Sequence, residues 1–99
     1  MRLHCLVPGC NHTRGDRKDD PIRQGMEWIC GEHWKSVPAF LRRRKARLYR
    51  RYRRMFGDNG FWHYPPGSPD RIAAARLDRI CGTAWLICKR VAIERSMGI

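Results

Sequence analysis

Hydrophobic residues recur at helical spacing in the middle of the chain, between Pro38 and Phe56. Apolar side chains at every third or fourth position predict a helix with one buried face. Gly57 follows this stretch and is expected to end the helix. The apolar stripe consists of Leu41, Leu48, Tyr52 and Met55, and it is widened at its ends by Phe40, Tyr49 and Phe56.

A longer helix is predicted from about Asp70 to about Arg95. Ser68 and Pro69 precede it, and a serine cap followed by a proline in the first turn favours a helix start. Its apolar face is wide enough to pack on the preceding helix and the N-terminal region, or on a second copy in a dimer. That face is formed by Ile72, Leu77, Ile80, Cys81, Ala84, Trp85, Ile87, Cys88 and Val91.

The N-terminal third has no helical period. It begins with a short extended stretch and a Pro-Gly turn, and the polar residues 11–24 predict an exposed loop or a hairpin tip. Residues 25–29 alternate sufficiently to predict a short strand. A first helical turn is expected near Cys30, with Pro38 interrupting or restarting it and Ser36 capping the restart.

These elements predict a small α-rich (α+β) protein that forms one structural domain. Such a short chain buries a small fraction of its surface and gains from a metal or a covalent cross-link. The predicted parts are an N-terminal module at 1–37, the middle helix at 38–57, an aromatic and proline-rich connector at 58–69, and an amphipathic helix at 70–99 that packs on the rest.

Positive charge is concentrated in the middle helix. The chain has 21 Lys and Arg against nine Asp and Glu, a net charge of +12, and nine of the cations lie between Pro38 and Phe56 without one acid. Such a local surplus is typical of a polyanion-binding element rather than of a solubilising surface. The nine are Arg42, Arg43, Arg44, Lys45, Arg47, Arg50, Arg51, Arg53 and Arg54.

Three cysteines and a histidine have the spacing of a zinc site. Cys5 and Cys10 flank a Pro-Gly turn, while Cys30 and His33 would share one face of a first helical turn. This order of a knuckle, a hairpin and then a helix is that of a treble clef, with one structural Zn²⁺. His12 or His4 in the ligand shell is the alternative. The cysteines could also be small buried apolar residues, but the agreement of spacing and order favours zinc.

The same segment resembles a group of small phage and prophage zinc-finger proteins, whose pattern also occurs as N-terminal extensions of HNH nucleases. The resemblance covers roughly residues 1–57. It implies a treble-clef zinc module but no particular role. The spacer is longer than usual for this group, and Pro38 is not part of the pattern. The matching residues are Cys5-LVPG-Cys10, the polar spacer 11–24, Gly25-MEWI-Cys30-GE-His33-Trp34 and Leu41-Arg42-Arg43-Arg44.

Nucleic-acid binding by the arginine-rich helix is the leading functional hypothesis, with DNA favoured over RNA. Arginine outnumbers lysine eight to one in this helix, and its planar fork suits phosphates and guanine edges. A solvated face is the simpler interpretation, but such a face normally mixes charges of both signs. The second hypothesis is an adaptor or inhibitor that docks its basic face on an acidic protein surface of a host or defence complex.

The aromatic residues near the arginines have two interpretations. Tyr49, Tyr52, Trp62 and Tyr64 could stack on bases. The connector aromatics could instead fill the gap between the two helices and the zinc module, which is favoured because a small domain must bury such surface.

Other classes of function have less support. With His33 used as a ligand, the only remaining cluster is His63 near Asp58, and it matches no nuclease motif, so no catalysis is expected. Five cysteines without a secretory signal favour a reducing, cytoplasmic location, and no segment is long enough for a membrane span. Cys81 and Cys88 are expected to be core residues.

Overall fold

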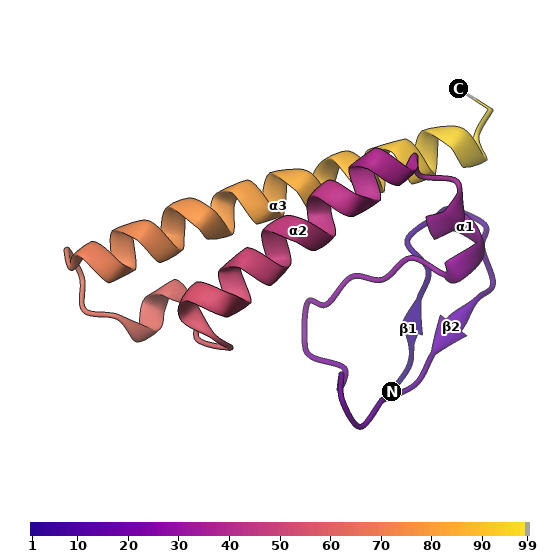
Figure 1. Ribbon diagram of the computed structural model, residues 1–99. Helices are drawn as coiled ribbons and strands as arrows, with labels where there is room; N and C mark the ends of the chain where they lie inside the picture. The colour runs from indigo at the N-terminus through magenta and orange to yellow at the C-terminus, as the bar shows by residue number, and fades with distance from the viewer. Residues whose placement is uncertain (99) are drawn as a thin grey trace. The chain divides into compact units, whose positions relative to one another are not determined.

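The computed structural model describes residues 1–98 and divides the chain into two compact units. The mixed unit comprises Met1–Pro38 and the chain from Lys89 onward, and the helical unit is Ala39–Cys88. The last helix contributes residues to both. The elements are β1 (Leu3–His4), β2 (Thr13–Arg14), α1 (Gly31–Lys35), α2 (Ala39–Phe56), the 3-10 helix η1 (Phe61–His63) and α3 (Pro69–Ser96) (Figure 1).

β1 and β2 form a small antiparallel sheet in the mixed unit. Leu3 lies opposite Arg14, and His4 lies opposite Thr13. Strands of two residues each give little stability of their own, so other contacts must hold the hairpin. The extended start of the chain agrees with the sequence, whereas β2 lies inside the stretch 11–24 that was expected to be a loop or hairpin tip.

The strand predicted for residues 25–29 is wrong. Gly25 adopts a φ of 78°, a left-handed conformation outside the strand region. Within the predicted strand, the Trp28 carbonyl accepts a hydrogen bond from the Leu6 N–H at 2.9 Å, but one such bond does not form a β-ladder. Within residues 1–98 the named strands are therefore β1 and β2 alone.

α1 and α2 are separate helices, as Pro38 suggested, but Ser36 does not act as expected. Its hydroxyl donates to the His33 carbonyl at 2.6 Å and so closes the end of α1. It does not cap the start of α2, which begins at Ala39. Pro38 lacks an N–H and has a fixed φ, so the α1 hydrogen-bond ladder cannot continue through it.

Arg14 is a buried arginine that organises the loop after β2. Its side chain is 5% exposed. Its Nη1 lies 2.9 Å from the Asp20 carboxylate, its Nη2 donates to the Asp20 backbone carbonyl, and its Nε donates to the Gly15 carbonyl at 3.3 Å. A buried guanidinium is tolerated only where its donors find partners. These bonds therefore fix the polar loop to the sheet.

Asp20→Ala is expected to destabilise the mixed unit by about 1–2 kcal/mol, because the buried Arg14 guanidinium loses a half-exposed carboxylate but keeps its bonds to two backbone carbonyls. Asp19→Ala is the matched control, since Asp19 is its exposed neighbour and should change stability by less than about 0.5 kcal/mol. Thermal unfolding of the two variants and of the unchanged protein measures both effects. Equal melting temperatures for the two variants would contradict this role of Arg14.

The helical unit is an antiparallel helix pair, in which α2 and the first part of α3 lie side by side (Figure 1). Near the connector, Phe56 packs with Ala74, Leu77 and Cys81 in a buried cluster. At the far end, the Cys88 thiol lies 3.6 Å from the Leu41 carbonyl. Four partly buried side chains pack against the Phe56 cluster, namely Leu48, Tyr52, Phe61 and Tyr64.

The connector supplies aromatic rings to this core. The Phe56 ring lies 5.9 Å from Tyr64 in an edge-to-face arrangement and 5.2 Å from Tyr52. Gly57 has a φ of 65° and ends α2, as the sequence predicts. Ser68 caps α3 by accepting a hydrogen bond from the Arg71 N–H at 3.2 Å. The chain thus reverses direction over a short, well-packed connector.

Candidate metal centre and basic helix

Four side chains of the mixed unit come together as the sequence spacing suggested. The ligand atoms of Cys5, Cys10, Cys30 and His33 all lie within 4.8 Å of one another. The first pair lies in the connection between β1 and β2, where the Cys10 N–H donates to the Val7 carbonyl at 3.1 Å and forms the turn. The second pair belongs to α1, with Cys30 at the N-cap. The cluster can hold a metal ion.

Three of the six separations of these atoms lie near those expected around a tetrahedral ion, and all six are within 4.8 Å. Zn–S bonds of about 2.3 Å and Zn–N bonds of about 2.0 Å place two tetrahedral sulfurs about 3.8 Å apart and sulfur and nitrogen about 3.5 Å apart. The Cys10 and Cys30 sulfurs are separated by 3.8 Å. The His33 Nδ1 lies 3.7 Å from the Cys5 sulfur and 3.2 Å from the Cys30 sulfur. The residues present therefore fit a single tetrahedral metal bound through Nδ1.

The protein environment promotes thiolate at one ligand and opposes it at another. Burial disfavours the Cys5 thiolate, but hydrogen bonds from the backbone of Cys30 and Val7 outweigh burial and lower the Cys5 pKa to about 7. At Cys10 the backbone N–H of His12 favours thiolate, yet desolvation and the neighbouring Cys5 and Cys30 thiols raise the pKa. Ionisation of all three neighbouring thiols costs free energy, because the thiolates repel one another, unless a bound cation neutralises their charge.

His12 lies next to the cluster without belonging to it. Its Nδ1 is 3.2 Å from the Cys10 sulfur, a hydrogen-bonding distance to a thiolate. The group of four that converges contains Cys10, and His12 and His4 are not among its members. A ring nitrogen that donates to a ligand sulfur orients that ligand. The alternative ligand set with His12 or His4 therefore has less support than the set with Cys10.

No family model, curated protein or solved structure matches this chain. In residues 1–98, every helix is too short or too polar to cross a bilayer.

The basic helix predicted from sequence is α2. Of its nine cations, Arg42 and Lys45 are partly buried and seven arginines are exposed. Four of the seven recur at helical spacing and form a stripe roughly 16 Å long. The ion pairs Arg14–Asp20 and Lys89–Glu27 involve residues outside α2. The exposed arginines are Arg43, Arg47, Arg50 and Arg54 in the stripe, with Arg44, Arg51 and Arg53 beside it.

Lys45 differs from the arginines around it. Its ammonium lies 4.0 Å from the centre of the Tyr49 ring and 5.6 Å from that of Trp85. Burial lowers the Lys45 pKa, and the Cys88 and Cys81 thiols only partly oppose this. The ammonium is thus placed for cation–π contact within the helical unit rather than for contact with a polyanion.

Lys45→Met is expected to weaken polyanion binding less than Arg47→Met does, although both remove one charge from α2. The reason is that the Lys45 charge lies against aromatic rings, whereas the Arg47 side chain is exposed. Titration of each variant with the same DNA duplex, followed by fluorescence anisotropy, measures the two losses of affinity. Equal losses would indicate that only the total charge of the helix matters.

The predicted stacking residues occupy different environments. Tyr52 donates from its hydroxyl to the Asn59 carbonyl at 2.7 Å, and Tyr64 packs in the core cluster. Tyr49 is 38% exposed and lies under Lys45, and Trp62 is 71% exposed. Trp62 is therefore the connector aromatic most open to a stacking partner. Phe61 and Tyr64 pack against the core of the helical unit, so the structural interpretation agrees with these two residues but not with the exposed Trp62 and His63.

Two cysteines are separate from the metal cluster. Cys81 and Cys88 are 7% and 1% exposed, consistent with the core role expected from the sequence. Desolvation raises the pKa of both thiols, with Lys45 opposing this shift in each case. Neutral, buried thiols of this kind behave as small apolar residues.

Two features have no clear sequence signal. The buried Arg14 lies in a polar stretch of charged residues, where burial of one arginine leaves no periodic pattern. The exposed apolar residues Met55 and Ile80 were counted in the buried faces of their helices, yet they are 53% and 41% exposed. Helical periodicity gives the direction of a side chain but not whether another element covers it.

Proposed function

We propose that the cluster of Cys5, Cys10, Cys30 and His33 binds one structural Zn²⁺ in a treble-clef-like module. Three soft sulfurs and one imidazole are typical of zinc, and four protein ligands leave no open position for a substrate. The proposal is supported by the tetrahedral separations of the ligand atoms and by the order of a ligand turn, a hairpin strand and a helix that carries the last pair. The same order supports a relationship to small phage zinc-finger proteins.

We propose further that the protein binds nucleic acid, DNA in preference to RNA, without catalysis. The observation that carries this proposal is the set of seven exposed arginines on α2, a helix with no acidic residue. Unbalanced cations on one helix repel one another, and a polyanion relieves that repulsion. Guanidinium groups along the stripe of Arg43, Arg47, Arg50 and Arg54 have the forked geometry that phosphate oxygens accept.

The salt dependence of duplex binding tests the nucleic-acid proposal. Neutralisation of phosphates releases counterions, so the logarithm of affinity should fall with the logarithm of salt with a slope of about −0.9 per phosphate contact. Four contacts from the stripe alone predict a slope steeper than about −3. Anisotropy titrations of a random-sequence duplex between low and moderate salt measure the slope. A slope shallower than this, or no binding at low salt, would refute phosphate neutralisation as the main force.

A further inference from the structure

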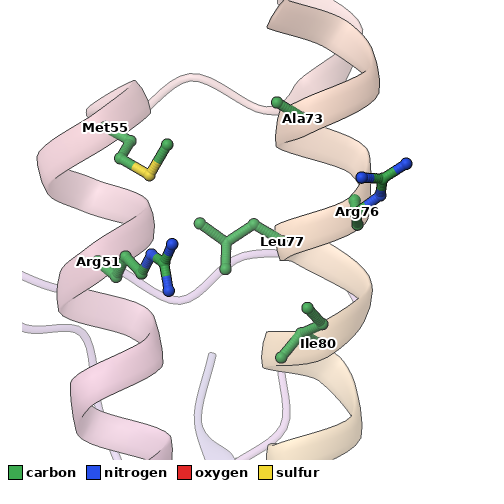
Figure 2. A pocket seen from close by; sticks show the side chains of 6 residues that line it. All are labelled: Arg51, Met55, Ala73, Arg76, Leu77 and Ile80. Carbon is green, nitrogen blue, oxygen red and sulfur yellow. The ribbon is translucent and has the colours of Figure 1, made fainter.

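The helical unit contains a groove whose apolar residues have no part in the nucleic-acid proposal. It has a volume of about 210 Å³. Figure 2 shows Met55 of α2 and Leu77 of α3 directed toward each other across this space, with Ile80 beside Leu77. The residues that line it are Arg51, Met55, Ala73, Arg76, Leu77 and Ile80.

Aliphatic side chains and cations meet in this groove. Met55 and Ile80 are 53% and 41% exposed, so the groove opens to solvent. The Arg51 side chain extends from α2 into the space between the helices, while the Arg76 guanidinium is directed outward from α3 (Figure 2). None of the lining residues carries negative charge. The groove therefore offers an apolar floor with positive charge at its edges.

The size and lining of the groove narrow the class of occupant. A volume of 210 Å³ is below that of usual small-molecule sites, which are about 300–1,000 Å³. A nucleobase stacks on aromatic faces, and no aromatic residue lines this groove. A second copy would bring another arginine-rich α2 toward the first, and like charges at close range oppose such a dimer.

We propose that this groove docks an acidic amphipathic helix of a partner protein. Aliphatic side chains spaced three or four residues apart on such a helix would contact Met55 and Ile80. Carboxylates beside them would pair with Arg51 and Arg76, where the charge is complementary. The stripe of Arg43, Arg47, Arg50 and Arg54 does not line the groove. Arg51 belongs both to the groove and to the seven exposed arginines of α2, so the two proposed surfaces adjoin at this residue.

The NMR signals of the methionine methyl groups test directly whether a peptide docks in the groove. Of the four methionines, Met1, Met26, Met55 and Met97, only Met55 lines the groove. The probe is a synthetic peptide of about 18 residues, roughly five helical turns, with leucine on one face and glutamate elsewhere. Added to the metal-loaded protein with ¹³C-methyl methionine, it should shift the Met55 signal saturably and leave Met26 and Met97 unchanged. Met55→Leu assigns the signal.

Matched substitutions distinguish peptide binding in the groove from non-specific electrostatic attraction to the protein. Ile80→Ser should weaken peptide binding about tenfold, while Ile72→Ser, the same change at an exposed α3 residue outside the groove, should leave it within about twofold. Arg51→Gln should weaken it several-fold, unlike Arg50→Gln in the stripe. Duplex titrations of the same variants keep the two surfaces distinguishable, because Arg50→Gln should weaken DNA binding and Ile80→Ser should not.

Three results would overturn the docking proposal. The first is equal binding of a peptide with the same composition but its leucines spread over all faces, since that would show charge attraction alone. The second is a Met55 shift that depends on protein concentration without peptide, which would assign the groove to a second copy. The third is a Met55 shift caused by duplex DNA and not by the peptide, which would place nucleic acid there.

Discussion

Removal of the proposed zinc ion, by chelation or by Cys30→Ser, is expected to unfold the mixed unit. Its sheet has two residues in each strand, so little else maintains its fold. Structural zinc in small zinc-finger peptides contributes about 10–16 kcal/mol of apparent binding energy, far more than a module of this size gains from its core. The helical unit has its own buried cluster around Phe56 and Leu77 and should keep most of its helix.

A cysteine outside the cluster supplies the control. Cys81→Ser makes the same chemical change at a buried position of the helical unit, 7% exposed. It should lower the stability of that unit without lowering the metal content. Elemental analysis measures zinc per chain, and amide NMR spectra report which residues lose their dispersed signals. Full zinc content in folded Cys30→Ser, or an unchanged spectrum after chelation, would refute the metal's structural role.

Reversing the charge of Arg43, Arg47 and Arg50 to glutamate is expected to abolish duplex binding at moderate salt. The loss of three phosphate contacts should reduce the salt slope by about 3 and the affinity at low salt at least about 100-fold. All three residues are exposed, and glutamate is a good helix former, so helicity and zinc content should not change. Anisotropy titrations, circular dichroism and elemental analysis measure the three quantities.

The matched control places the same charge change on another helix. Arg79, Arg90 and Arg95 are exposed residues of α3, and their replacement by glutamate lowers the net charge equally. This variant should retain most of its affinity, since only the charges beside the duplex release counterions. A comparable loss in both triple variants would show that net charge, and not the α2 stripe, determines binding.

The metal cluster and the long helices were largely accessible from the sequence. Each ligand pair is separated by a short turn or by one turn of helix, so local geometry limits where its side chains can lie. α2 was predicted to within a residue at its start, because Pro38 and Gly57 mark its ends. By contrast, residues 25–29 alternate like a strand but lack a partner over enough length, and pairing is a tertiary property.

The remaining features depend on contacts that no local pattern records. The burial of Arg14 depends on the backbone of Asp20 turning toward it, six residues further along the chain. In the sequence Lys45 is one more cation of the basic helix, yet its ammonium lies beside the rings of Tyr49 and of Trp85 from α3. The exposed floor of the groove at Met55 and Ile80 likewise depends on how far α2 and α3 stand apart, which periodicity does not specify.

The separation of the five cysteines into two groups has a consequence for oxidative stress. Cys81 and Cys88 have raised pKa values and are enclosed by the helix pair, so oxidants and alkylating reagents should spare them. Cys5, Cys10 and Cys30 are the other three cysteines, and their thiols would become reactive if a bound metal left. Oxidation of cysteine should therefore begin in the N-terminal region and spare the two thiols of the helix pair.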